Sequence, residues 1–330
     1  MAPPHGKCLL KVAGPEAKAA CGTTQLSGGL EVGIEGAIHV MRILFEEHRE
    51  AEDWGFLLID ARNAFNEENR TAMLWAVWHE WPSGAQFTFK CYRHWSTLVV
   101  RDTGDGSGHF LHSKEGVTQG DPLAMITYGI GVLSLLQDLR EAHPCVTQPW
   151  YADDAGAGGT FAEVQAHFLD LQVWGPARGY YPEPTKIILV VTPGNVTRAE
   201  EHFRGVGVRV LTDHRYLGGF LGDKSSKKEW LGDKVEGWTE SIATLSGVAL
   251  QHPQSAYAGL QNPLQQEWYF VQRVTPGVGA SFAPVEEALR EVFSPGSLLG
   301  TDGGTHDEGK HPPAVQAGGD GHPGSGNYGP

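Results

Sequence analysis

The pattern of apolar and polar positions in the first third of the chain predicts a helix, a strand and a second helix. Apolar residues recur at helical spacing over residues 30–50, which indicates an amphipathic helix. The short continuous apolar run 54–59 ends at Asp60 and is typical of a buried strand. A second helix is expected over residues 66–80, with Asn at its start and Pro82 ending it.

The middle of the chain predicts two hairpins separated by a buried helix. Segments 97–101 and 109–112 flank a turn rich in Gly and Asp, which indicates a hairpin with a loose loop. Pro122 suits the first turn of a largely apolar helix expected to run to about residue 140. The β-branched and aromatic residues of 146–151 then predict the first strand of the second hairpin.

Two adjacent carboxylates, Asp153 and Asp154, stand at the predicted tip of that second hairpin. The glycines that follow relieve steric limits, so the chain is expected to reverse direction there. Neighbouring strand residues point to opposite faces, so a core-facing pair would bury at least one carboxylate, whereas a tip can direct both toward solvent or a metal. The alternative interpretation is an ordinary polar turn, because aspartate is common in turns.

The last part of the chain changes from regular elements to a tail of low complexity. A helix is expected over 161–173, a strand over 186–191, a glycine-punctuated strand turn over 216–222 and mixed helical structure over 225–293. From 297 onward the chain is rich in Gly, Pro, His and Asp, with almost no apolar residues. Such a segment cannot offset its ordering entropy, so we expect disorder.

Composition limits the partners that the protein can have. The chain of 330 residues carries 25 Lys and Arg against 39 Asp and Glu, a net charge of −14, which argues against a broad basic surface for nucleic acid. Its 4 cysteines are widely spaced, so neither a zinc site nor a disulfide-linked partner is expected. A signal core is lacking and no run reaches the ~18 apolar residues of a membrane helix. We therefore expect an intracellular protein, cytoplasmic or nuclear, without a membrane partner.

The order of elements brings three carboxylates into one region if two strands pair. Asp60 ends one strand, while Asp153 and Asp154 occupy a hairpin tip, and paired strands lie ~4.8 Å apart. Like-charge repulsion in such a cluster is relieved by shifted protonation or by bound hard cations. Two magnesium ions ~3.5–4 Å apart can clamp the attacking and leaving oxygens of a phosphoryl displacement. Nucleotidyl transfer is the reaction class that fits.

Three segments in this order resemble the core motifs of reverse transcriptases, most closely those of non-LTR retrotransposons. They are Ile-Asp-Ala-Arg-Asn-Ala-Phe-Asn at 59–66, Gly-Val-Thr-Gln-Gly-Asp-Pro-Leu at 116–123 and Tyr-Ala-Asp-Asp at 151–154. Segments 179–186 and 216–222 resemble the two motifs that follow in that family, and the likeness spans about residues 20 to 225. The resemblance implies an α+β fold, with a palm-like antiparallel sheet and helices packed on one face. It also implies an RNA-directed DNA polymerase that extends a primer on an RNA or DNA template with dNTPs, using two Mg²⁺ ions, with Mn²⁺ a candidate substitute.

The same resemblance assigns a metal site to the carboxylates. Asp60 and Asp153 would be the principal metal ligands, with Asp154 beside them and the backbone carbonyl of Ala61 completing one coordination shell. Phe65 matches the bulky side chain that the family places under the sugar to exclude a 2′-hydroxyl. Its alternative role is that of a core aromatic at a helix entry.

Further matches concern the nucleotide and its leaving group. Gln119 and Gly120 match residues that pack near the incoming nucleotide and the template, and a turn that needs glycine is the alternative, compatible with the first. Lys186 matches a lysine near the triphosphate that acts as a proton donor to the leaving pyrophosphate. A solvated lysine opening a strand is the alternative.

The departures from the family suggest a truncated enzyme. We expect a loose segment at 1–24, a palm-like reverse transcriptase domain with partial fingers at 25–225, a helical region and candidate thumb remnant at 226–296, and the disordered tail at 297–330. Basic fingers residues are scarce upstream of the first aspartate, so activity is less certain than ancestry. Two alternatives stay open: a catalytically inactive retroelement fragment that retains the fold, and a metal-dependent nuclease.

Overall fold

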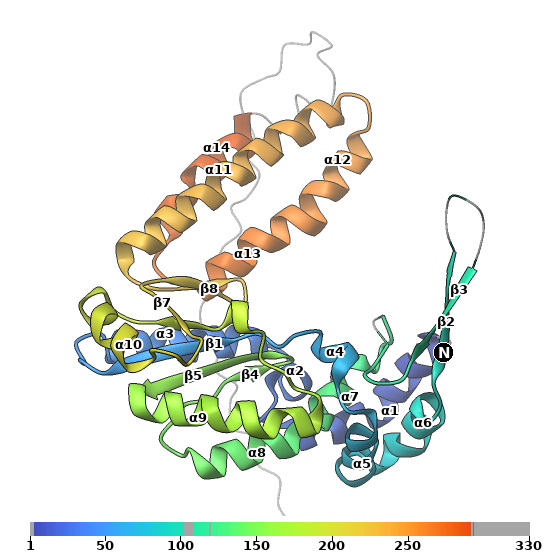
Figure 1. The fold of residues 1–330 in the computed structure, drawn as a ribbon. Coiled ribbons are helices and arrows are strands. Elements are labelled where there is room, and N and C mark those ends of the chain that lie inside the picture. Colours follow the sequence, from blue (N-terminus) through green and yellow to red (C-terminus); the bar gives the residue numbers. More distant parts are fainter. Residues whose placement is uncertain (1–2, 102–103, 105–107, 119, 292, 294–330) are drawn as a thin grey trace, which may run out of the picture.

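The computed structural model describes residues 3–101, 104, 108–118, 120–291 and 293. Figure 1 shows a mixed sheet with helices packed against it, a helical C-terminal unit above it and a hairpin that projects to one side. The α+β fold class expected from the sequence is thus confirmed. The predictions for Gln119 and for the tail 297–330 lie outside the described residues.

A five-stranded sheet forms the centre of the molecule, in the order β4-β5-β1-β6-β7. The strands are β1 (Trp54–Ile59), β4 (Trp150–Tyr151), β5 (Asp154–Thr160), β6 (Ile188–Val190) and β7 (Arg209–Leu211). Strand β1 pairs antiparallel with β5 on one side and with β6 on the other, while β6 and β7 are parallel. The central position of β1 explains its continuous apolar sequence, because both of its faces are covered.

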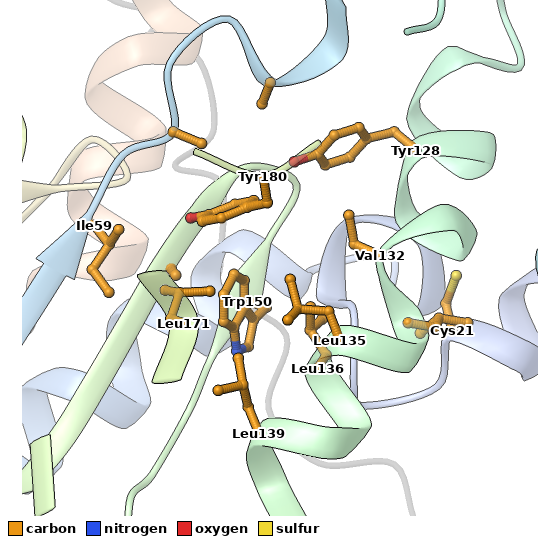
Figure 2. Packing of buried hydrophobic residues seen from close by; sticks show 14 of the residues in the cluster. Cys21, Ile59, Tyr128, Val132, Leu135, Leu136, Leu139, Trp150, Leu171 and Tyr180 are labelled. Atoms are coloured by element: carbon orange, nitrogen blue, oxygen red, sulfur yellow. The ribbon is translucent and has the colours of Figure 1, made fainter. Parts of the chain in front are cut away.

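Helices cover the two faces of the sheet unequally. The larger layer contains α7 (Ala124–Gly131), α8 (Leu133–Ala142) and α9 (Phe161–Trp174), and it forms one core with Leu57 and Ile59 of β1. Figure 2 shows the centre of this core, where Trp150 and Tyr180 pack against side chains of α8 and α9. The opposite face, which carries Phe56 and Leu58, packs on α3 (Gly33–Glu47).

The N-terminal segment is helical, which corrects the expectation of a loose entry over 1–24. Helix α1 (Pro3–Cys21) and the short α2 (Leu26–Gly29) pack against α7, and Ala13, Ala17 and Cys21 of α1 are buried. Ala13, Ala17 and Cys21 form a buried stripe of small residues at a spacing of four. Small side chains contribute little hydrophobicity, but they let α1 and α7 approach closely. Sequence hydrophobicity alone therefore gives little signal for this helix.

Two predicted helices are divided in the structure. The segment after β1 forms α4 (Ala64–Glu67) and α5 (Arg70–Glu80), because the side chain of Asn69 accepts a hydrogen bond from the N–H of Ala72 at 3.0 Å and caps the second helix. Pro82 ends α5 as expected, but it also begins α6 (Pro82–Tyr92). The single helix expected up to about residue 140 is interrupted at Val132, between α7 and α8.

The remaining elements lie around this body. Strands β2 (Ser96–Arg101) and β3 (Gly108–Ser113) form the projecting hairpin, α10 (Val196–His202) precedes β7, and β8 (His214–Tyr216) pairs with β9 (Gly219–Leu221). The C-terminal unit contains α11 (Lys224–Ala249), α12 (Pro253–Gly259), α13 (Gln265–Val274) and α14 (Ala283–Glu291) around a core of their own. In the part of the chain that the structure describes, no helix is long and apolar enough to cross a membrane.

Candidate functional site

Pairing of β1 with β5 brings two of the predicted carboxylates opposite each other. The antiparallel register aligns Ile59 with Ala155, so the next step along the two strands brings Asp60 opposite Asp154. Both aspartates line a cleft of about 310 Å³ at this edge of the sheet. The sequence-based expectation that these strands are neighbours is confirmed.

The third carboxylate belongs to the tight turn between β4 and β5. Tyr151 pairs with Asp154, so the hairpin forms as the sequence predicted, but its two turn residues are Ala152 and Asp153, and Asp154 opens β5. Ala152 has a positive φ of 53°, a conformation that costs energy for a residue with a Cβ and therefore needs support from its surroundings.

A buried glutamine from the N-terminal part of the chain supplies that support. The side chain of Gln25 is 0% exposed, and its Oε1 accepts from the N–H of Ala152 at 2.9 Å while its Nε2 donates to the carbonyl of Ala152 at 3.0 Å. The two bonds satisfy both backbone groups of the strained residue. Tyr180 adds a further contact, because its hydroxyl donates to the carbonyl of Asp153 at 2.9 Å. The aspartate turn is thus held from two sides.

Asp60 is held by a short antiparallel bridge on the other side of the site. The N–H of Glu183 donates to the carbonyl of Asp60, and the N–H of Arg62 donates to the carbonyl of Tyr181, each at 2.8 Å. Neither of these bonds uses the carbonyl of Ala61, the backbone group that the resemblance assigns to a metal shell.

The carboxyl groups of Asp153 and Asp154 have higher pKa values than those of exposed aspartates. Burial raises the pKa of Asp154 to about 6, and the negative charges of Asp153 and Asp60 act in the same direction. The pKa of Asp153 is also raised, mainly by burial and then by Asp60. A nearby positive charge favours the ionised forms, and Lys186 lowers the pKa of both carboxyl groups.

Lys186 supplies one positive charge to the cluster. Its Nζ lies 2.7 Å from Oδ2 of Asp60, and this hydrogen bond and the charge of Asp60 raise the pKa of the lysine. The side chain of Lys186 is 57% exposed, so the ion pair is solvated and can exchange partners. Lys186 ends a 3₁₀ turn, Pro184–Lys186, instead of opening a strand as the sequence suggested.

Three further basic residues lie in the same cleft and were missed at the level of sequence. Arg209, His214 and Arg215 line it together with Asp60 and Asp154. They come from β7 and β8, which lie more than fifty residues beyond the aspartate turn, and no local motif marks them. Burial lowers the pKa of His214, and the charge of Arg209 acts in the same direction. One wall of the cleft is therefore acidic and another is basic.

Phe65 and Gly120, the described residues assigned to nucleotide contact, lie outside this lining. Phe65 belongs to α4 and is half-buried; its carbonyl accepts from the N–H of Val117 at 2.7 Å. Its ring stacks on that of Tyr128 with centroids 4.5 Å apart. Gly120 is exposed with a φ of 85°, and a Cβ there would meet nothing within 4 Å, so the turn needs glycine for its backbone conformation alone.

No group of three or more His, Cys, Asp or Glu side chains among the described residues is arranged to hold a metal ion. The donor set of the aspartate cluster, which consists of carboxylate and carbonyl oxygens, nevertheless has the chemistry that Mg²⁺ and Mn²⁺ prefer. In the arrangement described, Lys186 provides the positive charge at Asp60. The pairing of Lys186 with Asp60 is the feature that a bound cation would have to replace.

No protein-family model and no curated protein matches the chain. Solved structures of telomerase resemble it over part of their length. The telomerase of Candida albicans in complex with a TWJ fragment of telomeric RNA is 11% identical, with a TM-score of 0.46, over 84% of this chain and 49% of that one. Apo telomerase of Candida tropicalis is 12% identical, with a TM-score of 0.44, over 64% of this chain and 39% of that one. The apo telomerase of Candida tropicalis truncated from the C-terminal domain is 14% identical, with a TM-score of 0.43, over 57% of this chain and 40% of that one. The chain spans less than half of the length of these telomerase chains.

Proposed function

We propose that the chain is the core of an RNA-directed DNA polymerase of retrotransposon origin, related to the non-LTR type, with residues 25–225 as its polymerase domain and 226–296 as a thumb remnant. The observation that carries the proposal is the convergence of Asp60, at the end of β1, with Asp153 and Asp154, at the supported turn between β4 and β5. Its proposed partners are an RNA or DNA template with its primer, and dNTPs, in an intracellular setting.

The carboxylates would hold two Mg²⁺ ions, with Mn²⁺ as a substitute. Asp60, Asp153 and Asp154 would provide side-chain oxygens and Ala61 its carbonyl. When bound, the ions neutralise negative charge on the phosphates and favour the ionised form of the primer 3′-hydroxyl. The elevated pKa of Asp154 supports this assignment, because a buried carboxylate that also faces the charges of Asp153 and Asp60 is stabilised in its ionised form by a nearby cation.

The basic residues of the cleft would handle the phosphates. Lys186 would exchange Asp60 for the triphosphate and donate a proton from Nζ to the leaving pyrophosphate oxygen. Arg209 and Arg215 line the same cleft, where their permanent charges would hold nucleic-acid or pyrophosphate oxygens. Phe65, Gln119 and Gly120 would contact the sugar and base of the incoming nucleotide.

Primer extension on an RNA template with dNTPs and Mg²⁺ tests the proposal. The wild type is expected to extend the primer, Asp153→Asn to lose at least ~1,000-fold in rate because a charged ligand becomes neutral, and Asp138→Asn, an exposed aspartate on α8, to behave as the wild type. Extension that is independent of metal, or equal rates for Asp153→Asn and the wild type, would contradict it.

A second candidate is an inactive retroelement fragment that retains the fold but not the chemistry. The ion pair between Lys186 and Asp60 favours the absence of chemistry, because it occupies one of the three carboxylates, and the net charge of −14 favours weak binding of a polyanionic template. This candidate predicts no nucleotide incorporation, whether or not primer-template binds. A metal-dependent nuclease would instead cleave nucleic acid in the absence of dNTPs.

A further inference from the structure

Tyr128 forms the rigid base on which the ring of Phe65 rests. The two rings are stacked, with centroids 4.5 Å apart and planes inclined by 24°. Tyr128 is 1% exposed and belongs to α7, in which seven of the eight residues are buried. A side chain on such a helix has almost no freedom to change rotamer, because protein interiors are close-packed.

The backbone of Phe65 is fixed independently of that stack. Its carbonyl accepts from the N–H of Val117 at 2.7 Å, and the carbonyl of Glu68, one helical turn later, accepts from the N–H of Gly116 at 2.8 Å. A Cβ on Gly116 would lie 2.2 Å from the carbonyl oxygen of Phe65, so only glycine allows this approach. With the backbone fixed, the orientation of the Phe65 ring depends on the surface against which it packs.

The ring of Tyr128 is directed toward a residue that holds the aspartate turn. Figure 2 shows it directed from α7 toward Tyr180, whose hydroxyl donates to the carbonyl of Asp153. The hydroxyl of Tyr128 is buried and has no hydrogen-bond partner in the part of the chain that the structure describes. Burial raises its pKa, and the charges of Tyr180, Asp153 and Asp154 act in the same direction. Tyr128 therefore stacks on Phe65 and lies within the electrostatic influence of the carboxylates.

We propose that Tyr128 is a positioning residue that fixes the Phe65 ring relative to Asp153 and Asp154 and thereby sets the discrimination between deoxyribo- and ribonucleotides. The inference rests on the proposed polymerase function and adds a residue that contacts no substrate. The ring, not the hydroxyl, carries the role, because the stack involves the ring faces and the hydroxyl has no partner among the described residues.

Two substitutions at one position separate the ring from the hydroxyl. Tyr128→Phe keeps the stack and is expected to keep the wild-type ratio of dNTP to rNTP incorporation. Tyr128→Met keeps an apolar, unbranched side chain but removes the ring, and the ratio is expected to fall roughly 3- to 10-fold, the range that corresponds to the loss of one aromatic pair. In a Phe65→Ala background, Tyr128→Met is expected to change the ratio no further, since the two residues act as one unit.

The readouts distinguish the two proposals. Absence of extension with either kind of nucleotide by the wild type contradicts the proposed function. Normal extension with an unchanged ratio in Tyr128→Met overturns the role of Tyr128 and leaves the polymerase intact. A second measurement, by nuclear magnetic resonance, needs no turnover. The protein is labelled at phenylalanine, and the ring-proton signals of Phe65 are assigned by their loss in Phe65→Leu. These signals are expected to keep their ring-current shift in Tyr128→Phe. Loss of that shift in Tyr128→Phe would also overturn the inference.

Discussion

Burial is the reverse of hydrophobicity in two of the hairpins, β2–β3 and β4–β5. The hairpin β2–β3 is rich in large apolar residues, yet Val99 is 57% exposed and Phe110 69% exposed. Strand β5 of the other hairpin reads Asp-Ala-Gly-Ala-Gly-Gly-Thr and is buried over its five central residues. The apolar surface that covers β5 comes from other elements: Phe56 contacts the position of Gly158, and Met41 that of Gly156. The burial of β5 therefore depends on apolar side chains from neighbouring elements, and the small residues of β5 let those side chains come close.

The same difference separates a turn held by its neighbours from a hairpin whose described strands project from the body. The turn at Ala152 and Asp153 receives hydrogen bonds from Gln25 and Tyr180, while the strands of β2–β3 extend away from the body. A catalytic carboxylate has to be held within a fraction of an ångström, whereas a projecting hairpin has no such demand. We therefore expect substitutions around the first turn to affect activity and matched substitutions in the projecting hairpin to have little effect.

The largest effect is expected for Gln25→Leu. The substitution leaves the buried N–H and carbonyl of Ala152 without partners, which costs about 2–4 kcal/mol of unfolding free energy. Displacement of the turn by about 1 Å would lower the rate of nucleotide incorporation roughly 100-fold. Chemical denaturation and single-turnover primer extension measure the two effects. Gln137→Leu, at an exposed position on α8, is the matched control; equal behaviour of the two variants would refute the role of Gln25.

A smaller effect is expected when a side chain is added to each hairpin. In Gly156→Ala the new Cβ would lie 3.0 Å from the hydroxyl of Tyr216 and 3.1 Å from Cε of Met41, so we expect a loss of about 1–3 kcal/mol. In Gly108→Ala on β3 the nearest atom would be Cγ1 of Val99 at 3.7 Å, and we expect a change within about 0.5 kcal/mol. Thermal unfolding of the two variants measures both changes in stability. A larger loss of stability in Gly108→Ala than in Gly156→Ala would contradict the difference proposed between the two hairpins.

The sequence predicted the aspartate turn but not its supports. Asp153 and Asp154 were located because a strand pattern, a turn and glycines are local signals. Gln25 lies 127 positions from Ala152, and its role arises only when α1, α2 and α7 pack together, so no local pattern indicates it. The stack of Phe65 on Tyr128 was missed for the same reason. The functional roles of these residues stay predictions until they are measured.

Some helix boundaries also depend on tertiary contacts, which the periodicity of the sequence does not show. The mixed fold and most strands followed from apolar runs and turns, because those signals are local. Helix α1 was missed because its buried stripe consists of small residues. The division of α7 from α8 at Val132 directly follows Gly131, and apolar periodicity, which continues through this point, does not show it.

An effect of about the same size as that of Gly156→Ala concerns pH and the core beneath the buried hairpin. His167 is fully buried with its Nε2 3.2 Å from Oε1 of Gln148, and burial lowers its pKa to about 3. Because the folded-state pKa lies below the unfolded value, the stabilisation is complete above about pH 6.5 and is lost as the pH falls toward 3. We expect His167 to make the protein about 2 kcal/mol less stable at pH 5 than at pH 7.

Denaturation at the two pH values checks this expectation against a matched pair of variants. His167→Gln is expected to remove the contribution of His167 to the difference, and His109→Gln, at an exposed position of the projecting hairpin, to leave the difference unchanged. An undiminished pH dependence in His167→Gln would show that other groups account for it.

Divalent-cation binding tests most directly whether the buried hairpin and β1 form a metal centre. Titration with Mn²⁺, monitored by the electron paramagnetic resonance of the free ion, is to be compared for the wild type, Asp153→Asn with Asp154→Asn, and the control Asp138→Asn. Saturable binding is expected for the wild type and for the control, and its loss for the double variant, because the carboxylate oxygens at the turn would be replaced by neutral amides. Equal binding by the wild type and the double variant would contradict the assignment of the metal centre to Asp60, Asp153 and Asp154.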